Sequence, residues 1–391
     1  MSEVVYLFGA GINRGIEVHD GVVPPLATDL FVQAMKCRRL GDDHYLQKLE
    51  PVFEYIERYW KLSRENLAHG HFDLEACYTL LELQLNEAKI SENRENIIKL
   101  QDTILKLTIL FAETLQEFEH SAYNSESFRT LGQIIYSEQA DVLTFNYDTL
   151  IESTIESASR VSGCVPEAYK GRPHESGEIS DEEIRYSHFN WNRPLAYGVK
   201  FDEVMLHRAG VPTFVDADRF YGAHSEGLYR NRVLKLHGSI NWFVYSGIRK
   251  YDLGNERNAT NKGKTLLSGG QRWFNEPAEK DGEIIEPMII TPTLYKNYSE
   301  NNLIASVWQQ ARDSLANCKR LVVGGYSFPP TDFAVRKLFL EAFESHVLEE
   351  IFVINPDTSV VKTVKDLSHF DRPILVCKDL DEFVKLYQRR N

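Results

Sequence analysis

A histidine separates two strand-like runs in the segment VLKLHGSINWFVY, residues 233–245. His237 follows an apolar run, and Gly238 and Ser239 lead from it into the second run. An imidazole has an ordinary pKa of about 6.5, so it can accept a proton near neutral pH, as a general base must. A histidine in such a place is, by itself, more often structural and held by one hydrogen bond. The rest of the chain decides whether this one has a catalytic role.

Polar or glycine-rich junctions follow each strand-like run of the chain. The apolar, β-branched runs are Val4–Phe8, Val142–Phe145, Val233–Leu236, Met288–Ile290, Leu321–Val323, Ile351–Ile354 and Ile374–Val376. The junctions after them are, in chain order, GAGINRG, NYD, HGS, TPT, GGYSFPPTD, NPD and CKDLD. In an open parallel sheet, the carboxyl ends of the strands form the ligand crevice. Polar junctions after all of these runs therefore favour a binding site over a set of ordinary turns.

The alternation of strands and helices predicts the fold class. Helical patterns such as TLIESTIESASR and FAVRKLFLEAFESH lie between the apolar runs, and buried parallel strands typically have such near-continuous apolar sequences. We expect an α/β fold that is Rossmann-like, with a mostly parallel sheet, a large helical insertion and a smaller loop-rich subdomain. The predicted catalytic domain comprises residues 1–28 and 138–391.

Residues 29–137 lack this alternation of strands and helices and are predicted to be a helical insertion. Apolar residues recur there at three-to-four spacing, which is typical of a helix with one apolar face; they are Ile97, Leu100, Ile104, Leu107, Phe111, Leu115 and Phe118. A stripe of this kind is more often intramolecular core than an assembly seam. The insertion is nevertheless the segment that we would choose for subunit contacts.

Two further segments, residues 161–231 and 246–285, are polar and aromatic without a clear period. They are predicted to be loop-rich insertions within the catalytic domain, either long loops or a small subdomain at one end of the sheet. Functional lids have this composition, and Phe189, Trp191 and Tyr197 supply aromatic surface in the first segment. We expect that segment to cover the crevice and to exclude bulk water.

Composition limits the class of protein. The chain has 391 residues and a formal net charge of −13, so its average surface repels nucleic acid and anionic membranes, and no direct nucleic-acid binding is expected. No apolar run approaches the ~18 residues of a membrane span, and the start MSEVVYLFGAG lacks the basic region of a signal peptide; a cytoplasmic protein is expected. The five cysteines include no CxxC pair, which disfavours a disulfide framework or a cysteine-zinc site.

The first junction, GAGINRG, has the glycines that allow amide groups to approach a diphosphate closely. A tight structural turn explains the same sequence equally well. Its glycines, Gly9, Gly11 and Gly15, have the spacing GxGxxxG rather than GxGxxG, and a helical segment follows instead of a second strand ending in an acid. A hydride-transferring dehydrogenase therefore fits poorly.

Other junctions place amides, hydroxyls and carboxylates at the same predicted edge. Asn146 and Asp148 follow the second strand, where they could contact a ligand or form an Asx turn that caps the next helix. Ser327 and Asp332 stand in GGYSFPPTD, and the acid could equally cap a helix. Asn355 could bind a ribose hydroxyl or initiate a turn.

In combination, these motifs resemble the sirtuin family in its bacterial, sirtuin-like NAD-hydrolase branch. The matching elements are GAGIN at 9–13, TFNYD at 144–148, LHGS at 236–239, GGYSF at 324–328 and IN at 354–355, in the family's order and across almost the whole chain. The resemblance implies catalytic roles for His237, Asn146 and Asp148, with the last two at the nicotinamide ribose. It implies that NAD, as the substrate, is bound by Gly9, Ala10, Gly11, Asn13, Gly324, Gly325, Ser327, Asp332, Asn355 and Lys378.

Departures from the sirtuin pattern bear on the reaction. Sirtuin deacylases have Gln where this chain has Phe145, a second His where Ile151 stands, and a four-cysteine zinc ribbon that this sequence lacks. These differences disfavour peptide deacylation, and no metal is expected. The expected reaction is hydrolysis of NAD to nicotinamide and ADP-ribose. Two alternatives stay open: an NAD-dependent deacylase or ADP-ribosyltransferase, and an NAD- or ADP-ribose-binding sensor without turnover.

The resemblance also implies a regulated assembly. An enzyme that destroys NAD without an acceptor would harm its host, so the resting protein is expected to be nearly inactive. Sirtuin-like NAD hydrolases of bacterial antiphage systems commonly form homo-oligomers and often work with a HerA-type ATPase. The chain has no Walker A motif GxxxxGK[ST], so a nucleotide-driven motor would be a separate polypeptide.

Overall fold

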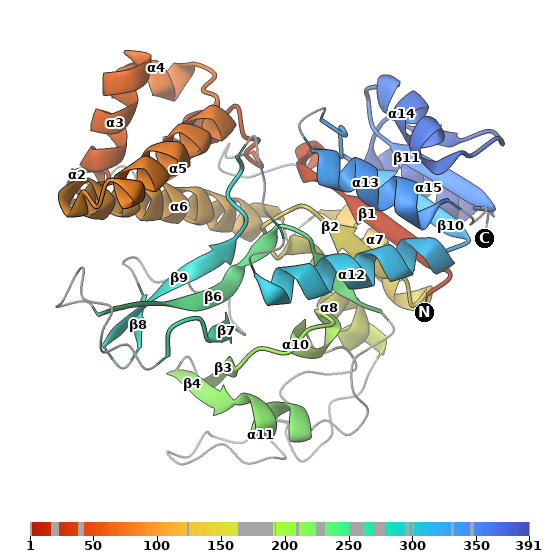
Figure 1. Cartoon of the computed structure of the whole chain (residues 1–391). Coiled ribbons are helices and arrows are strands. Elements are labelled where there is room, and N and C mark those ends of the chain that lie inside the picture. The colour runs from red at the N-terminus through yellow and green to blue at the C-terminus, as the bar shows by residue number, and fades with distance from the viewer. Residues whose placement is uncertain are drawn as a thin grey trace.

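A computed structural model gives the fold. It describes residues 2–16, 23–37, 43–122, 125–162, 191, 193–208, 211–223, 231–249, 261–268, 278–280, 282–293, 298, 301–329, 332–344 and 348–390. The described residues form a parallel sheet flanked by helices, a group of helices beside it, and a second sheet (Figure 1).

The parallel sheet has six strands in the order β12-β11-β10-β1-β2-β5. They are β1 (Val4–Phe8), β2 (Asp141–Thr144), β5 (Val233–Lys235), β10 (Arg320–Gly324), β11 (Glu350–Ile354) and β12 (Leu375–Cys377). Every neighbouring pair is parallel, and Phe8 at the end of β1 pairs with Thr144 and Gly324. The central strands therefore end at one level, as a ligand crevice requires. The predicted α/β class with a parallel sheet is confirmed.

Two groups of helices flank this sheet. The helices that follow or precede its strands are α7 (Glu126–Ser137), α8 (Leu150–Ser162), α12 (Asn302–Asn317), α13 (Phe333–Ala342), α14 (Ser359–Ser368) and α15 (Leu380–Arg390). Helix α7 packs against α8 and α15, whereas α13 packs against α12 and α14. Their apolar faces and the strands share one large core, which is the physical reason that the strands are apolar throughout.

The helices between β1 and α7 have a core of their own. After the short 3₁₀ helix η1 (Ala10–Gly15) come α1 (Leu30–Ala34), α2 (Asp43–Lys48), α3 (Glu50–Trp60), α4 (Arg64–His69), α5 (Leu74–Ile90) and α6 (Arg94–Ala122). Asp73 caps the N-terminus of α5, because its carboxylate accepts a hydrogen bond from the amide of Ala76 at 2.9 Å. The stripe on α6 packs inside the molecule, because Leu107, Phe111 and Leu115 are buried in this core.

The second sheet has the strand order β4-β3-β7-β6-β9-β8. Its strands are β3 (Glu203–Arg208), β4 (Val211–Asp216), β6 (Gly238–Arg249), β7 (Thr265–Ser268), β8 (Ala278–Lys280) and β9 (Glu283–Ile289), with the short helices α10 (Arg193–Ala196) and α11 (Ala217–Gly222) nearby. Strands β3 and β7 are parallel and the other pairs are antiparallel. Strands β3, β4, β7 and β8 lie in the two segments expected to be loop-rich. Much of 161–231 and 246–285, including Phe189, lies outside the described residues.

One predicted parallel strand is wrong. Met288 and Ile289 belong to β9, which runs antiparallel to β6 in the second sheet. The two strands approach closely at Gly238, whose φ is +77° and where a Cβ atom would lie 2.2 Å from the Met288 carbonyl oxygen. An apolar run does not specify which sheet it joins, because a buried strand in either sheet has the same sequence character. Within the described ranges, no helix is long and apolar enough to cross a membrane.

Candidate active site

A cavity of about 420 Å³ lies at the carboxyl ends of β1, β2, β10 and β11, within the range of roughly 300–1,000 Å³ that is typical of ligand sites. Most of the predicted site residues line it, namely Gly9, Ala10, Gly11, Asn13, Asn146, Asp148, His237, Gly325, Ser327, Asp332 and Asn355. Two predicted residues do not. Gly324 is the last residue of β10 and accepts a hydrogen bond from the Gly9 amide at 3.0 Å. The Lys378 side chain is 75% exposed, with its Nζ 3.7 Å from Asp379.

The first and fifth junctions pack together through their glycines. The Gly11 amide donates to the Gly325 carbonyl oxygen at 2.9 Å, and Gly325 has φ +63°. A Cβ atom at Gly325 would lie 1.8 Å from the Ile12 nitrogen, so only glycine fits there. The structural-turn explanation of GAGINRG therefore applies in part. Because the Gly9 and Gly11 amides donate to chain carbonyl oxygens, these two N–H groups are not left to bind a diphosphate.

The NYD turn after β2 joins the first junction through side chains. Asp148 Oδ1 accepts a hydrogen bond from the Leu150 amide at 3.1 Å, which is the predicted Asx-type cap of the next helix. Its other oxygen, Oδ2, accepts one from Asn13 Nδ2 at 3.1 Å. Burial raises the pKa of Asp148, and the charge of Lys235 opposes that rise. The carboxylate is thus held in place at the cavity wall.

Asn146 has an incompletely satisfied side chain. Its backbone amide donates to Thr144 Oγ1 at 3.0 Å, but its side-chain Oδ1 is buried and has no hydrogen-bond partner among the residues that the structure describes. A buried acceptor without a partner costs about 1–3 kcal/mol, and such atoms in folded proteins usually meet a water or ligand. Asn146 lines the cavity, so a bound molecule can supply that partner.

His237 is buried among aromatic rings. Only 5% of the residue is exposed, and its ring centroid lies 5.0 Å from that of Phe145, 5.8 Å from that of Tyr147 and 5.9 Å from that of Tyr298. Its backbone carbonyl accepts a hydrogen bond from the Ile290 amide at 2.8 Å. The imidazole is therefore fixed in position where β5 leaves the parallel sheet and β6 begins.

Asp332 orders two tyrosines around the histidine. Its Oδ1 accepts a hydrogen bond from the Tyr298 hydroxyl at 3.2 Å, and its Oδ2 accepts one from the Tyr326 hydroxyl at 2.8 Å. The Tyr298 hydroxyl is also 3.4 Å from His237 Nε2. Burial, together with the charge of Asp332, raises the pKa of Tyr298, so this phenol stays protonated. Sequence reasoning did not identify either tyrosine, and no periodicity marks them.

The adenosine-side predictions have structural roles as well. Asn355 Nδ2 donates to the Tyr326 carbonyl oxygen at 3.3 Å, and Oδ1 accepts from the Asp357 amide at 2.9 Å. The turn that was the alternative explanation is therefore present. Ser327 is exposed at the cavity wall, where its hydroxyl is accessible to a ligand.

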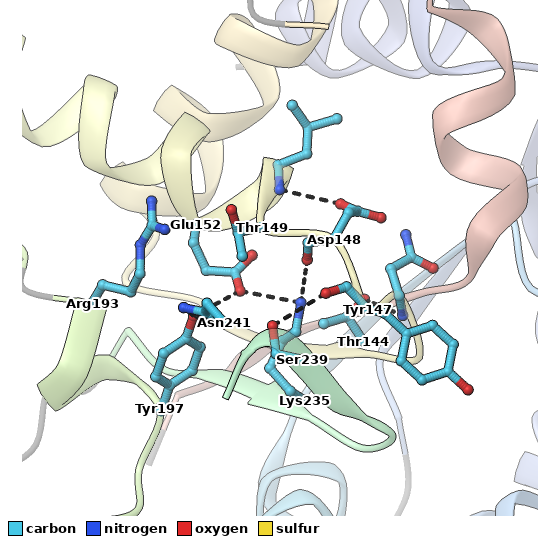
Figure 2. Close-up of polar contacts among 12 residues, drawn as sticks. Thr144, Tyr147, Asp148, Thr149, Glu152, Arg193, Tyr197, Lys235, Ser239 and Asn241 are labelled. Carbon is cyan, nitrogen blue, oxygen red and sulfur yellow. Dashed lines mark hydrogen bonds and ion pairs between the residues drawn. The ribbon is translucent and has the colours of Figure 1, made fainter. Parts of the chain in front are cut away.

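A buried polar network supports the NYD turn from below (Figure 2). Lys235 Nζ donates to the Asp148 carbonyl oxygen and lies 3.1 Å from Glu152 Oε1. The Tyr197 hydroxyl donates to the same Glu152 oxygen at 3.1 Å. These residues were absent from the predicted site, although a lysine within the apolar run VLKL is a signal that could have found one of them. Glu152 stands in a helix with no such mark.

A second carboxyl group of the network, that of Glu119 on α6, accepts hydrogen bonds from the Thr149 amide and hydroxyl. Burial and the nearby carboxylate of Asp148 raise the pKa of Glu119 to about 8. The folded protein thus holds this proton to a higher pH than the unfolded chain. Ionisation of Glu119 consequently lowers the free energy of unfolding as the pH rises between about 4.5 and about 8.

Replacing Glu119 with glutamine is expected to remove this pH dependence. The stability of the variant relative to the wild type should rise with pH through that window, by at most about 1.4 kcal/mol per pH unit. Urea denaturation at about pH 5 and about pH 8 measures the difference. Glu117→Gln, at a half-buried position of the same helix, is the control and should show no such trend. A pH-independent difference for Glu119→Gln would contradict the assignment.

No group of three or more His, Cys, Asp or Glu residues in the described part of the chain is arranged to hold a metal ion. Four buried cysteines, Cys37, Cys77, Cys318 and Cys377, are thiols that take part in no disulfide. Cys164 lies outside the described residues.

No protein-family model and no curated protein matches the chain. A Sir2 homologue solved with NAD matches at 12% identity and a TM-score of 0.40, covering 100% of this chain and 91% of that one. Mutant Sir2 homologues solved with 2′-O-acetyl ADP-ribose match at 12% identity and a TM-score of 0.41, covering 99% of this chain and 92% of theirs. A mutant Sir2 homologue solved with ADP-ribose matches at 13% identity and a TM-score of 0.41, covering 100% of this chain and 93% of that one. The fold class follows from the strand order of the parallel sheet and its register.

Proposed function

We propose that the protein is an NAD glycohydrolase, which cleaves the nicotinamide N-glycosidic bond to give nicotinamide and ADP-ribose. One observation carries the proposal: His237 and the unpartnered side-chain oxygen of Asn146 line the same cavity at the carboxyl ends of the parallel strands. The order of the sirtuin-like motifs along the chain supports it. The stacked rings of Phe145 and Tyr326, with centroids 4.3 Å apart, add an apolar wall suited to a planar nicotinamide or ribose face.

The proposed chemistry needs little from the protein apart from charge and position. In NAD, the leaving group is a cationic pyridinium, so the C1′–N1 bond breaks with both electrons going to nicotinamide nitrogen and no proton is required. The transition state resembles an oxocarbenium ion, as in glycoside hydrolysis. The Asp148 carboxylate, when ionised, would stabilise that positive charge. Asn146 Oδ1 would accept a hydrogen bond from the attacking water or a ribose hydroxyl.

His237 would act as the general base. As the water oxygen bonds to C1′, its proton would pass to the imidazole, which then releases it to solvent. The Tyr298 hydroxyl donates to Asp332, so its oxygen is left to accept a hydrogen bond from His237 Nε2. Asp332 and Tyr298 would thereby orient the ring.

Incubation of the purified protein with NAD, followed by chromatography of the products, tests the proposal. Release of nicotinamide and ADP-ribose without any acceptor supports hydrolysis. Release only when an acylated peptide or another acceptor is present would instead indicate a deacylase or an ADP-ribosyltransferase. Binding of NAD without turnover, measured by calorimetry, would indicate a sensor.

We also propose that the enzyme acts in the cytoplasm in antiphage defence as a homo-oligomer, held inactive until a partner such as a HerA-type ATPase acts on it. The helical insertion is the proposed contact surface. Although the α6 stripe is internal, α5 and α6 expose other apolar residues: Leu83 is 56% exposed, Ile90 85% and Ile98 37%. Exposed apolar side chains that form a patch are typical of contact surfaces, and we propose that these residues contribute to one.

Light scattering on the purified protein is expected to give a mass above the 45.1 kDa of one chain. The double substitution Leu83→Glu with Ile90→Glu should reduce that mass by placing charges in the contact. Phe333→Glu, at an apolar residue 75% exposed on α13, is the matched control and should leave the mass unchanged. A wild-type monomer with full, partner-independent turnover would exclude the proposed assembly and its regulation.

A further inference from the structure

We infer that Lys235 and Glu152 are positioning residues of the active site, an inference that rests on the proposed function for its catalytic meaning. Lys235 is the last residue of β5 and lies two residues before His237. Its Nζ donates to the Asp148 carbonyl oxygen and lies 3.1 Å from Glu152 Oε1, and neither side chain of this ion pair has any exposed surface. Figure 2 shows the lysine reaching from its strand to the NYD turn and the start of α8.

The hydrogen bonds around His237 explain why this contact positions catalytic groups. The β2–β5 ladder ends with Thr144 opposite Lys235, so strand pairing does not extend to Asn146 or Asp148. Beyond the ladder, the turn is held through two carbonyl groups. The Tyr147 carbonyl oxygen accepts from the Ile240 amide at 3.0 Å and from Ser239 Oγ at 3.2 Å.

The Asp148 carbonyl oxygen is held by Lys235, on the other side of His237 in the chain. The segment that carries His237 therefore bonds to the turn that carries Asn146 and Asp148 at two places. One contact comes from a residue before the histidine, and the other from residues after it. Loss of the lysine would remove the contact that precedes the imidazole, and the distance between the general base and the water-orienting amide would be held less tightly.

The charges of the pair are costly, which argues against a purely structural role. A buried ion pair is often no more stabilising than apolar residues of similar volume. This pair is also incompletely satisfied, because Glu152 Oε2 is buried without a hydrogen-bond partner in the part of the chain that the structure describes. Apolar side chains could fill the same space. They could not donate to the Asp148 carbonyl or place a positive charge beside its carboxylate.

The same two strands provide a matched control at their opposite ends. Arg232 Nη2 lies 2.6 Å from Asp141 Oδ2, and its Nε donates to Asp141 Oδ1 at 3.2 Å. The Arg232 side chain is 15% exposed and that of Asp141 is fully buried. This pair joins β5 to β2 at their amino ends, on the side away from the cavity. It is comparable in burial and charge but distant from His237.

The experiment compares Lys235→Met, the double variant Lys235→Met with Glu152→Met, and Arg232→Met. Lys235→Met is expected to lower both the melting temperature and kcat, because it leaves Glu152 buried and unpaired. The double variant should regain the melting temperature while kcat stays about 10- to 100-fold below the wild type, with KM for NAD nearly unchanged. Arg232→Met should lower the melting temperature and leave kcat near the wild-type value.

Amide hydrogen exchange gives a readout that needs no turnover. Exchange in the peptide covering residues 145–150 should be faster in the double variant and unchanged in Arg232→Met. The inference is overturned if the double variant regains kcat together with its melting temperature, if Arg232→Met loses kcat equally, or if exchange at 145–150 does not change. If the wild-type protein releases no nicotinamide, the proposed function fails separately, and the exchange data alone decide whether Lys235 fixes the turn.

Discussion

Replacing His237 with alanine is expected to lower the rate of nicotinamide release from NAD by about 100-fold or more, the usual effect of removing a general base. The fold should persist, because the ring lies at the cavity wall and the backbone bond from Ile290 to His237 does not depend on the side chain. Binding of ADP-ribose should be largely retained, since the imidazole acts at the reacting carbon. Steady-state kinetics, calorimetry and a melting curve measure the three quantities.

The matched control for this variant is His71→Ala, at an exposed position between α4 and α5. It should leave turnover, binding and melting temperature unchanged. A folded His237→Ala protein with near wild-type turnover would show that the histidine is structural. Loss of fold in that variant would call for His237→Gln, which keeps a planar polar side chain but cannot serve as a base at neutral pH.

Replacing Asn146 with alanine is expected to lower turnover by about 100-fold as well, in the range seen when a charge-stabilising or orienting group is removed. Its effect on stability should differ from that of most buried substitutions. Because Asn146 Oδ1 has no partner within the described structure, deleting it removes a desolvated acceptor and should leave the free energy of unfolding unchanged or raise it slightly. Reduced turnover with retained stability is the signature of a residue kept for its ligand.

Asn231→Ala is the matched comparison for Asn146→Ala. Asn231 also has a buried Oδ1 without a partner among the described residues, but its Nδ2 donates to the Ala140 carbonyl oxygen and it does not line the cavity. This substitution should lower stability and spare turnover. If Asn231→Ala lowered turnover and Asn146→Ala lowered only stability, the unpartnered oxygen of Asn146 would no longer support the proposed function.

The sequence by itself determined the parallel sheet and most of the wall of the cavity. Near-continuous apolar runs identify buried parallel strands, and the crevice of such a sheet forms where the strands end. The positions of Asn146, Asp148 and His237 therefore followed from local pattern alone. The structural alternatives that the pattern left open, such as the cap formed by Asp148 at the Leu150 amide, are present together with the cavity.

Other features needed the tertiary structure. Met288 belongs to β9, which pairs with β6 in the second sheet, and the periodicity of its apolar run does not specify that partner. Lys378 follows a strand as the pattern required, yet its side chain is directed into solvent, because a junction fixes where the backbone ends and leaves the direction of a long side chain to its neighbours.

The supporting contacts of the site were also decided only by folding. The pairing of Lys235 with Glu152 joins positions 83 residues apart, and Tyr298 reaches Asp332 from a separate segment of the chain. Such pairs form when packed elements bring distant side chains together, and hydropathy specifies which face is buried without specifying the partner. The sequence thus determined which residues reach the crevice, whereas tertiary packing decided what holds them there.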